Sequence, residues 1–406
     1  MSKASGKIIQ ASRVQDLKYA IRDISAEARK MAAQGKDLIW LNIGDPNKFD
    51  FETPQNIVDA FVKAARENKS FYSESQGILP LREAIVEKET KINGAKNLTV
   101  DDVHVTAGIS EGIMFLFGSL LNQGDEVLIP GPAYPSYTAF PKFYEAQAVT
   151  YRTISDDNWQ PDEEDIRKKV TDKTKAILVI NPNNPTGAVY REKELKNIVD
   201  IAGEFNIPII ADEIYDRLTM DQKFIGMPSV SKDVPLFMMN GFSKVYLMPG
   251  WRVGYCYLQD PDDKIRDVYE GIIKLGRLRL CVNTPAQYGC IEALTGPQDH
   301  IKETVAKLRS RRDLIYKRLN EIDGISTEKP EAAFYIFPKI ENLGKYKTDK
   351  EFILSLLREE GVVGVFGSGF DPIYGNNHFR LVFLSPDKII EDAMHRLENF
   401  MKRIEK

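Results

Sequence analysis

The chain has 406 residues, 43% hydrophobic and 28% charged, an ordinary composition for a folded globular protein that excludes a disordered or fibrous one. At this length we expect one large domain with a smaller companion. The 55 Lys and Arg residues against 59 Asp and Glu residues give a net charge of −4, so neither nucleic acid nor an anionic membrane is an expected partner.

Cysteine and histidine usage argues against disulfides and metal sites. The three cysteines have no paired spacing, so they form neither a disulfide framework nor a Cys-based zinc site by themselves. The four histidines are scattered without ligand spacing, so no metal is expected. The N-terminal segment lacks the apolar stretch of a secretory signal, and no window is apolar for long enough to span a bilayer. We therefore expect a soluble cytoplasmic protein.

Between about residues 100 and 260, short apolar runs alternate with amphipathic stretches. The amphipathic stretches predict helices at 111–121 and 191–205. The apolar runs predict strands at 103–106, 126–129, 176–180, 208–211, 236–239 and 253–258. Continuous apolar strands separated by helices are typical of an α/β domain with a mostly parallel sheet.

After about residue 285 the pattern changes to that of a smaller α+β domain. It predicts a charged helix at 300–320, a strand at 334–338, a helix at 349–360, a strand at 379–383 and a final helix from Asp387. We expect the N-terminal segment to join this part. The predicted division is a large domain at 48–285 and a small domain made of 1–47 and 286–406.

In an open parallel sheet, ligands bind at the carboxyl ends of the strands, so polar residues that follow strand-like runs are the candidates for a binding site. Gly108, Ile109 and Ser110 follow one strand and open a helix, which predicts either a phosphate site or an ordinary serine cap. Tyr134 and Tyr137 lie in a Pro-rich loop after the next strand. They can stack on a planar ring or simply pack the turn.

Two further strand ends carry amides and carboxylates. The loop NPNNPTG, which contains Asn184, exposes amide side chains for binding or for bracing itself. Asp212 and Glu213 end a strand, with Tyr215 close behind them. A carboxylate at the floor of a cleft needs a cation or a metal, although many strand-end carboxylates only cap a helix.

The segment GFSKVYLMPGWRVGY places Lys244 among apolar neighbours, with Arg252 following in the same loop. Partial burial of Lys244 predicts a depressed pKa and a nucleophilic amine. Arg380 lies between Phe379 and Leu381 in an apolar strand. A buried guanidinium needs an anion, and its planar fork matches a carboxylate.

Taken in chain order, these segments resemble the class I aminotransferases, enzymes of fold type I that depend on pyridoxal 5′-phosphate (PLP). The resemblance extends over essentially the whole chain and rests on the combined order of the motifs, since each alone is common. It implies that Lys244 carries PLP covalently and moves the proton during catalysis. It implies that Asp212 pairs with the ring nitrogen, and that Tyr215 and Asn184 hydrogen-bond the ring oxygen.

The remaining cofactor contacts are implied in the same way. Tyr134 would stack on the ring. The phosphate would be held by Gly108, Ile109, Ser110, Ser243 and Arg252, with Tyr72 of a second subunit, which implies a homodimer with shared active sites. Many relatives have a serine where this chain has Gly241. The departure puts the anchoring role of Ser243 in doubt.

For the substrate, the resemblance implies that Arg380 binds the α-carboxylate, assisted by Asn184 and the backbone of Gly44. Tyr19 and Arg22 resemble an element that closes over the substrate, although a plain amphipathic helix explains them almost as well. The segment 275–287, LGRLRLCVNTPAQ, is most similar to the alanine aminotransferase branch. Whether its Arg277, Arg279 or Asn283 contact substrate stays open, because a solvated helix face explains the two arginines equally well.

The predicted reaction is a ping-pong transfer of the amino group of L-alanine to 2-oxoglutarate, giving pyruvate and L-glutamate. The first alternative is an aspartate or broad-specificity aminotransferase, and a PLP β-lyase is a weaker one. A non-catalytic PLP-binding regulator would need a preceding DNA-binding module, for which the sequence leaves no room.

Overall fold

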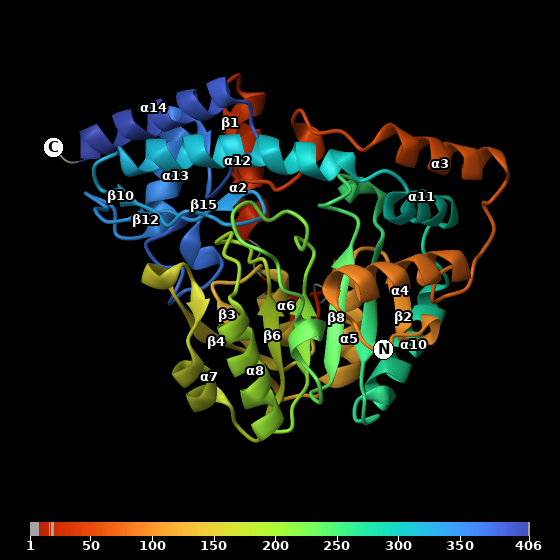
Figure 1. Cartoon of the computed structure of the whole chain (residues 1–406). Coiled ribbons are helices and arrows are strands. Elements are labelled where there is room, and N and C mark those ends of the chain that lie inside the picture. The colour runs from red at the N-terminus through yellow and green to blue at the C-terminus, as the bar shows by residue number, and fades with distance from the viewer. Residues whose placement is uncertain (1–7, 16, 18–19, 405–406) are drawn as a thin grey trace, which may run out of the picture.

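The computed structural model describes residues 8–15, 17 and 20–404. Its largest feature is an eight-stranded sheet (Figure 1). The strands are β2 (Val103–Thr106), β3 (Glu126–Gly131), β4 (Gln147–Ile154), β5 (Gln160–Pro161), β6 (Thr174–Ile180), β7 (Ile209–Asp212), β8 (Leu236–Gly241) and β9 (Gly254–Gln259). Their order is β2-β9-β8-β7-β6-β3-β4-β5, with the central run from β8 to β4 parallel and with β9 and β5 antiparallel to their neighbours.

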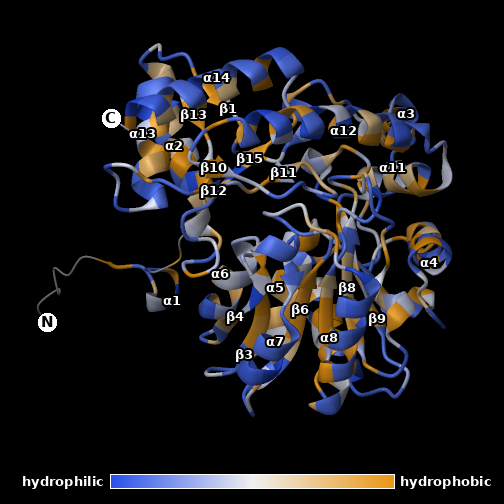
Figure 2. Ribbon diagram, turned by 60° about the vertical axis from the view of Figure 1, so that its left-hand side comes forward, coloured by the Kyte–Doolittle hydropathy of each residue, from blue (hydrophilic) through white to orange (hydrophobic). Residues whose placement is uncertain are grey.

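Both faces of this sheet are buried, because successive residues of each strand enter opposite hydrophobic layers. In β6, Ala176, Leu178 and Ile180 join one layer, while Ile177 and Val179 join the other. The first layer is covered by α5 (Ile109–Leu120), α6 (Ser136–Phe143) and α10 (Arg266–Arg279), and the second by α4 (Leu79–Asn93), α7 (Glu163–Lys169) and α8 (Glu192–Glu204). Figure 2 shows the hydrophobic strands between these helices. Burial on both faces explains why the strands are continuously apolar.

A smaller part built from the two ends of the chain lies across one edge of this body, above the sheet in Figure 1. Its strands are β1 (Ile39–Trp40), β10 (Ile325–Ser326), β11 (Tyr335–Ile336), β12 (Lys339–Ile340), β13 (Val362–Val363), β14 (Val365–Phe366) and β15 (Phe379–Val382). Its helices are α2 (Ala20–Ala33), α12 (Asp299–Asn320), α13 (Asp349–Glu360) and α14 (Asp387–Ile404). β1 pairs with β13 in parallel, which brings the N-terminal segment into contact with the C-terminal part.

Local sequence signals account for the ends of these helices. Thr348 caps α13 by accepting a hydrogen bond from the backbone N–H of Glu351, and Gly361 ends the helix at φ 74°. The predicted helix at 349–360 therefore has the observed bounds. The predicted strand at 334–338 is observed only as the short β11.

The α/β class with a large, mostly parallel sheet is confirmed. The domain boundaries stay a prediction. Four further α-helices complete those of the described residues, namely α1 (Ser12–Gln15), α3 (Gln55–Arg66), α9 (Met227–Val230) and α11 (Thr284–Thr295), and α11 packs against α3 and α4. Within the described part of the chain, no helix is long and apolar enough to cross a membrane.

Candidate active site

A cavity of about 490 Å³ opens at the carboxyl ends of the parallel strands, where the smaller part meets the sheet. Most residues predicted for the site line it, although they come from segments far apart in the sequence. They are Arg22, Gly44, Ile109, Ser110, Tyr134, Asn184, Asp212, Tyr215, Ser243, Lys244, Arg252 and Arg380. A volume of this size is typical of small-molecule sites.

Lys244 follows β8 and projects its amine into this cavity. Its Nζ donates a hydrogen bond to the carbonyl oxygen of Gly44, 2.7 Å away. Burial lowers the pKa of Lys244 to about 8, because the nearby carboxylates of Asp45 and Asp212 do not offset the loss of hydration. An amine with this pKa is neutral in an appreciable fraction of molecules near neutral pH, which makes it a usable nucleophile and base.

Asp212 ends β7 on the floor of the cavity. Its Oδ2 accepts a hydrogen bond from the hydroxyl of Tyr137 at 2.7 Å, and its Oδ1 accepts one from the backbone N–H of Ile214 at 3.1 Å. Burial raises the pKa of Asp212 to about 6 despite these two donors. A buried carboxylate of this kind favours a cationic partner in the cavity.

Arg380 enters the cavity from β15 of the smaller part and is fully buried. Its Nη1 donates to Oδ1 of Asn184 at 2.9 Å, and its Nη2 donates to the carbonyl oxygen of Asn42 at 2.6 Å. One guanidinium thus joins the N-terminal segment, the loop after β6 and the C-terminal part. A buried cation in a cavity is suited to binding a carboxylate.

The N-terminus of α5 also borders the cavity, through Ile109 and Ser110. Gly108 precedes the helix at φ 74°, and a Cβ placed on it would lie 2.4 Å from Nη2 of Arg252. The bare backbone therefore lets the guanidinium of Arg252 lie directly beside the first N–H groups of the helix. Helix N–H groups with an adjacent arginine are suited to holding a phosphate.

Comparison with known proteins agrees with this geometry. Residues 36–397 match the family model of aminotransferase class I and II. An alanine aminotransferase from Mycobacterium tuberculosis is 38% identical, over 97% of this chain and 92% of that protein. A glutamate-pyruvate aminotransferase from Escherichia coli is 35% identical, over 97% and 98%. The chain belongs to the class I and II aminotransferases.

A solved relative supports the same assignment. An alanine aminotransferase from Pyrococcus furiosus superimposes with a TM-score of 0.95 at 54% identity, covering 97% of this chain and 100% of that one. The chain is thus similar to these aminotransferases over nearly its whole length, and its fold is that of fold-type I enzymes.

Some predicted residues of this aminotransferase lie away from the cavity. Tyr72 is 81% exposed and does not line it. Arg279 is absent from the cavity lining of the described chain, since its guanidinium pairs with Glu111 at 3.2 Å. Asn283 caps α11 by accepting from the N–H of Ala286. Arg277 is exposed on the last turn of α10, and Tyr19 lies outside the described residues.

Two residues close to the cavity acquire contacts that the sequence analysis did not assign. The sequence predicts Tyr137 as a loop aromatic, but it lies in α6 and its hydroxyl donates to Asp212. Tyr335 lines the cavity and lies 2.8 Å from Tyr215, hydroxyl to hydroxyl. Tyr134 lies in the loop before α6 and Tyr137 in the first turn of that helix, and the recurrence of a tyrosine three places on is the only sequence signal for Tyr137. No local pattern marks Tyr335.

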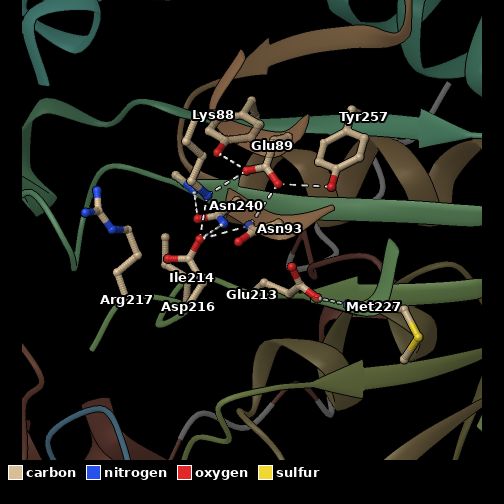
Figure 3. Close-up of polar contacts among 12 residues, drawn as sticks. Lys88, Glu89, Asn93, Glu213, Ile214, Asp216, Arg217, Met227, Asn240 and Tyr257 are labelled. Atoms are coloured by element: carbon tan, nitrogen blue, oxygen red, sulfur yellow. Dashed lines mark hydrogen bonds and ion pairs between the residues drawn. The ribbon is translucent and has the colours of Figure 1, made fainter. Parts of the chain in front are cut away.

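A buried lysine, Lys88, lies behind the strands of the site. We call Lys88, Glu89, Asn93, Asp216 and Asn240 the Lys88 cluster (Figure 3). Nζ of Lys88 donates to Oε1 of Glu89 at 2.7 Å and to Oδ2 of Asp216 at 2.5 Å. Asn240 also donates to Asp216, at 2.9 Å. The cluster therefore connects α4 to the segments that follow β7 and end β8, which carry the site residues.

Proposed function

We propose that this aminotransferase uses pyridoxal 5′-phosphate to transfer the amino group of L-alanine to 2-oxoglutarate, giving pyruvate and L-glutamate. The observation that carries the proposal is the convergence of Lys244, Asp212 and Arg380 on one cavity. The names of the relatives from M. tuberculosis, E. coli and P. furiosus support alanine as donor.

The residues present fit this cofactor. The raised pKa of Asp212 reflects a buried carboxylate suited to pair with a protonated ring nitrogen. Tyr215 and Asn184 would hydrogen-bond the ring oxygen, and Tyr134 would lie against the ring. The first N–H groups of α5, Ser110, Ser243 and Arg252 would hold the phosphate. When bound, the cofactor supplies an electron sink that stabilises negative charge at the substrate α-carbon.

The side chains of this protein divide the remaining work. Arg380 would bind the substrate α-carboxylate through its fork, with Asn184 and the backbone of Gly44 beside it, and so orient the α-carbon toward Lys244. Nζ of Lys244 would attach the cofactor and then move the α-proton as base and acid. Arg22, from helix α2 of the N-terminal segment, lines the cavity, where it would face the substrate.

A homodimer with shared active sites is part of the proposal. Tyr72 is 81% exposed and Phe71 is 53% exposed, which is unusual for neighbouring aromatic side chains. A partner that covers them would place Tyr72 at the phosphate of the partner's cofactor.

A cytoplasmic location is also part of the proposal. The three cysteines of the described chain are unpaired, in keeping with a reducing cytoplasm.

The test is a matrix of initial rates with purified enzyme, with alanine, aspartate and a cysteine-type donor against several 2-oxo acids. We expect alanine with 2-oxoglutarate to be at least about tenfold faster than aspartate, because one decisive contact is worth about 1.4 kcal/mol. Faster turnover of aspartate would replace alanine with an aspartate or broad-specificity activity. Release of pyruvate from the cysteine-type donor without an acceptor would indicate a β-lyase.

A further inference from the structure

Tyr335 on β11 contacts three parts of the site. Its hydroxyl lies 2.8 Å from the hydroxyl of Tyr215, and the guanidinium of Arg380 lies over its ring at 4.6 Å from the centroid. A Cβ on Gly44 would lie 2.2 Å from the Tyr335 hydroxyl, so that hydroxyl fills the space a side chain at position 44 would occupy. Tyr335 is thus buried between the carboxylate-binding and ring-binding residues.

Either tyrosine can donate in the contact between the two hydroxyls, and the proposed function selects one direction. Each phenol has one proton to donate. Under the proposed function, on which this step rests, Tyr215 donates its proton to the ring oxygen of the cofactor. Tyr335 must then be the donor in the 2.8 Å contact, which creates a chain of two donors that ends at the ring oxygen.

Arg380 acts on the first donor of this chain. Burial raises the pKa of Tyr335 to about 12, and the charge of Arg380 opposes that rise. Tyr215, Tyr134 and Asp212 also face the Tyr335 hydroxyl: the hydrogen bond with Tyr215 acts to lower its pKa, and the hydroxyl of Tyr134 and the carboxylate of Asp212 act to raise it. The guanidinium therefore makes Tyr335 a better donor for as long as its positive charge is not neutralised.

We propose that Tyr335 is a positioning residue that couples carboxylate binding at Arg380 to the hydrogen bond Tyr215 makes with the cofactor ring oxygen. A substrate carboxylate neutralises Arg380, which weakens donation by Tyr335 and in turn by Tyr215. The route is separate from the direct contact of Arg380 with Asn184 at 2.9 Å. Both routes begin at the same guanidinium.

The experiment is a pH titration of the visible absorbance of the cofactor-loaded enzyme, which reports a proton shared between the Lys244 nitrogen and the ring oxygen. A weaker donor leaves more negative charge on that oxygen, so the proton is held more firmly and the midpoint rises. Tyr335→Phe should raise the midpoint by about 0.5–1 pH unit, the value of one hydrogen bond. Tyr215→Phe should raise it as well, and the double variant should shift no further than Tyr215→Phe alone.

Propionate, an alanine analogue without the amino group, gives a second measurement. It should raise the wild-type midpoint by neutralising Arg380, and this rise should be smaller in Tyr335→Phe and in Tyr215→Phe. Tyr151→Phe is the matched control, because that buried hydroxyl donates only to the carbonyl oxygen of Leu178, at 2.9 Å, within the sheet. Its midpoint should equal that of the wild type.

Three results would overturn the inference: an unchanged midpoint in folded Tyr335→Phe, additive shifts in the double variant, or an undiminished propionate effect in Tyr215→Phe. The propionate measurement in Tyr215→Phe needs no change at Tyr335. It therefore tests the proposed coupling even if Tyr335→Phe does not fold. A wild-type protein without a visible band would instead contradict the proposed cofactor.

Discussion

Lys244 is half-buried beside the cavity and Lys88 is buried behind the strands, and their surroundings move their pKa values in opposite directions. At Lys244, burial lowers the pKa to about 8, and the charges of Arg380 and Arg252 act in the same direction. At Lys88, burial acts to lower the pKa, but contacts with Asp216 and Glu89 raise it above its ordinary value. Two carboxylates within hydrogen-bonding distance keep Lys88 charged, so it acts as a structural cation. The carboxylates near Lys244 are farther from its amine, so its pKa stays low and the amine is reactive.

The largest effect should come from removing the reactive lysine. Lys244→Ala should lower kcat at least about 10⁴-fold, because both covalent attachment and proton transfer are lost. The free energy of unfolding of the cofactor-free protein should not fall, because burial disfavours the charged form of Lys244. Steady-state kinetics and the visible spectrum are the measurements, and Lys91→Ala, on the exposed face of α4, is the control. Retention of the visible band together with turnover would contradict the assignment.

Removing the structural lysine should instead affect stability. Lys88→Met should lower the free energy of unfolding by about 3–5 kcal/mol, because it leaves Asp216 and Glu89 buried without their cation. Urea unfolding measures the change. Lys91→Met removes a lysine from the same helix, but its pair with Glu87 is exposed, so the loss should stay below about 1 kcal/mol. Equal losses in the two variants would refute the contrast.

Chemical labelling of the cofactor-free protein should separate the lysines by reactivity. With a pKa of about 8, Lys244 should react with an amine-directed reagent roughly 100-fold faster at pH 7 than an ordinary lysine. Labelling should rise with a midpoint near pH 8, whereas Lys88 should stay unlabelled until unfolding. Mass spectrometry of peptides provides the labelling rates.

The low pKa of Lys244 also affects stability. Because the unfolded state holds the Lys244 proton more tightly, this group makes the free energy of unfolding rise with pH between about 8 and 10.5.

The smallest predicted effect concerns the residue that holds Asp212. Tyr137→Phe should lower kcat about tenfold, because the carboxylate loses one hydrogen-bond donor and its pKa rises further. Tyr151→Phe removes an equally buried hydroxyl, and it should lower stability without lowering kcat. A tenfold loss in both variants would show that kcat responds to sheet stability rather than to Asp212.

Parallel strands explain why much of the site was predictable. Asn184, Asp212 and Lys244 follow neighbouring strands β6, β7 and β8, whose carboxyl ends meet at one edge. An arginine in an apolar strand needs an anion, so the sequence alone marks Arg380 as a candidate, and it lines the cavity. Its carbonyl partner at Asn42 requires the three-dimensional arrangement of the chain ends.

Long-range contacts account for what the sequence analysis missed. Tyr335 has no distinguishing neighbours in the chain, and its contact with Tyr215 depends on how the smaller part docks on the sheet. Lys88 and Glu89 look like surface residues of a charged helix. They are buried because α4 packs against β2 and places them beside Asp216 and Asn240 (Figure 3).

The hydrogen bonds of Arg380 to Asn184 and Asn42 have a consequence for how the protein is synthesised. A nascent chain emerges N-terminus first, so the residues proposed to hold the cofactor leave the ribosome well before Arg380 does. Until β15 emerges, the loop after β6 and the segment at Asn42 have no guanidinium to join them. The carboxylate site is therefore among the last parts of the enzyme to be completed, and chains that stop short of β15 would retain the cofactor residues without the means to hold a substrate.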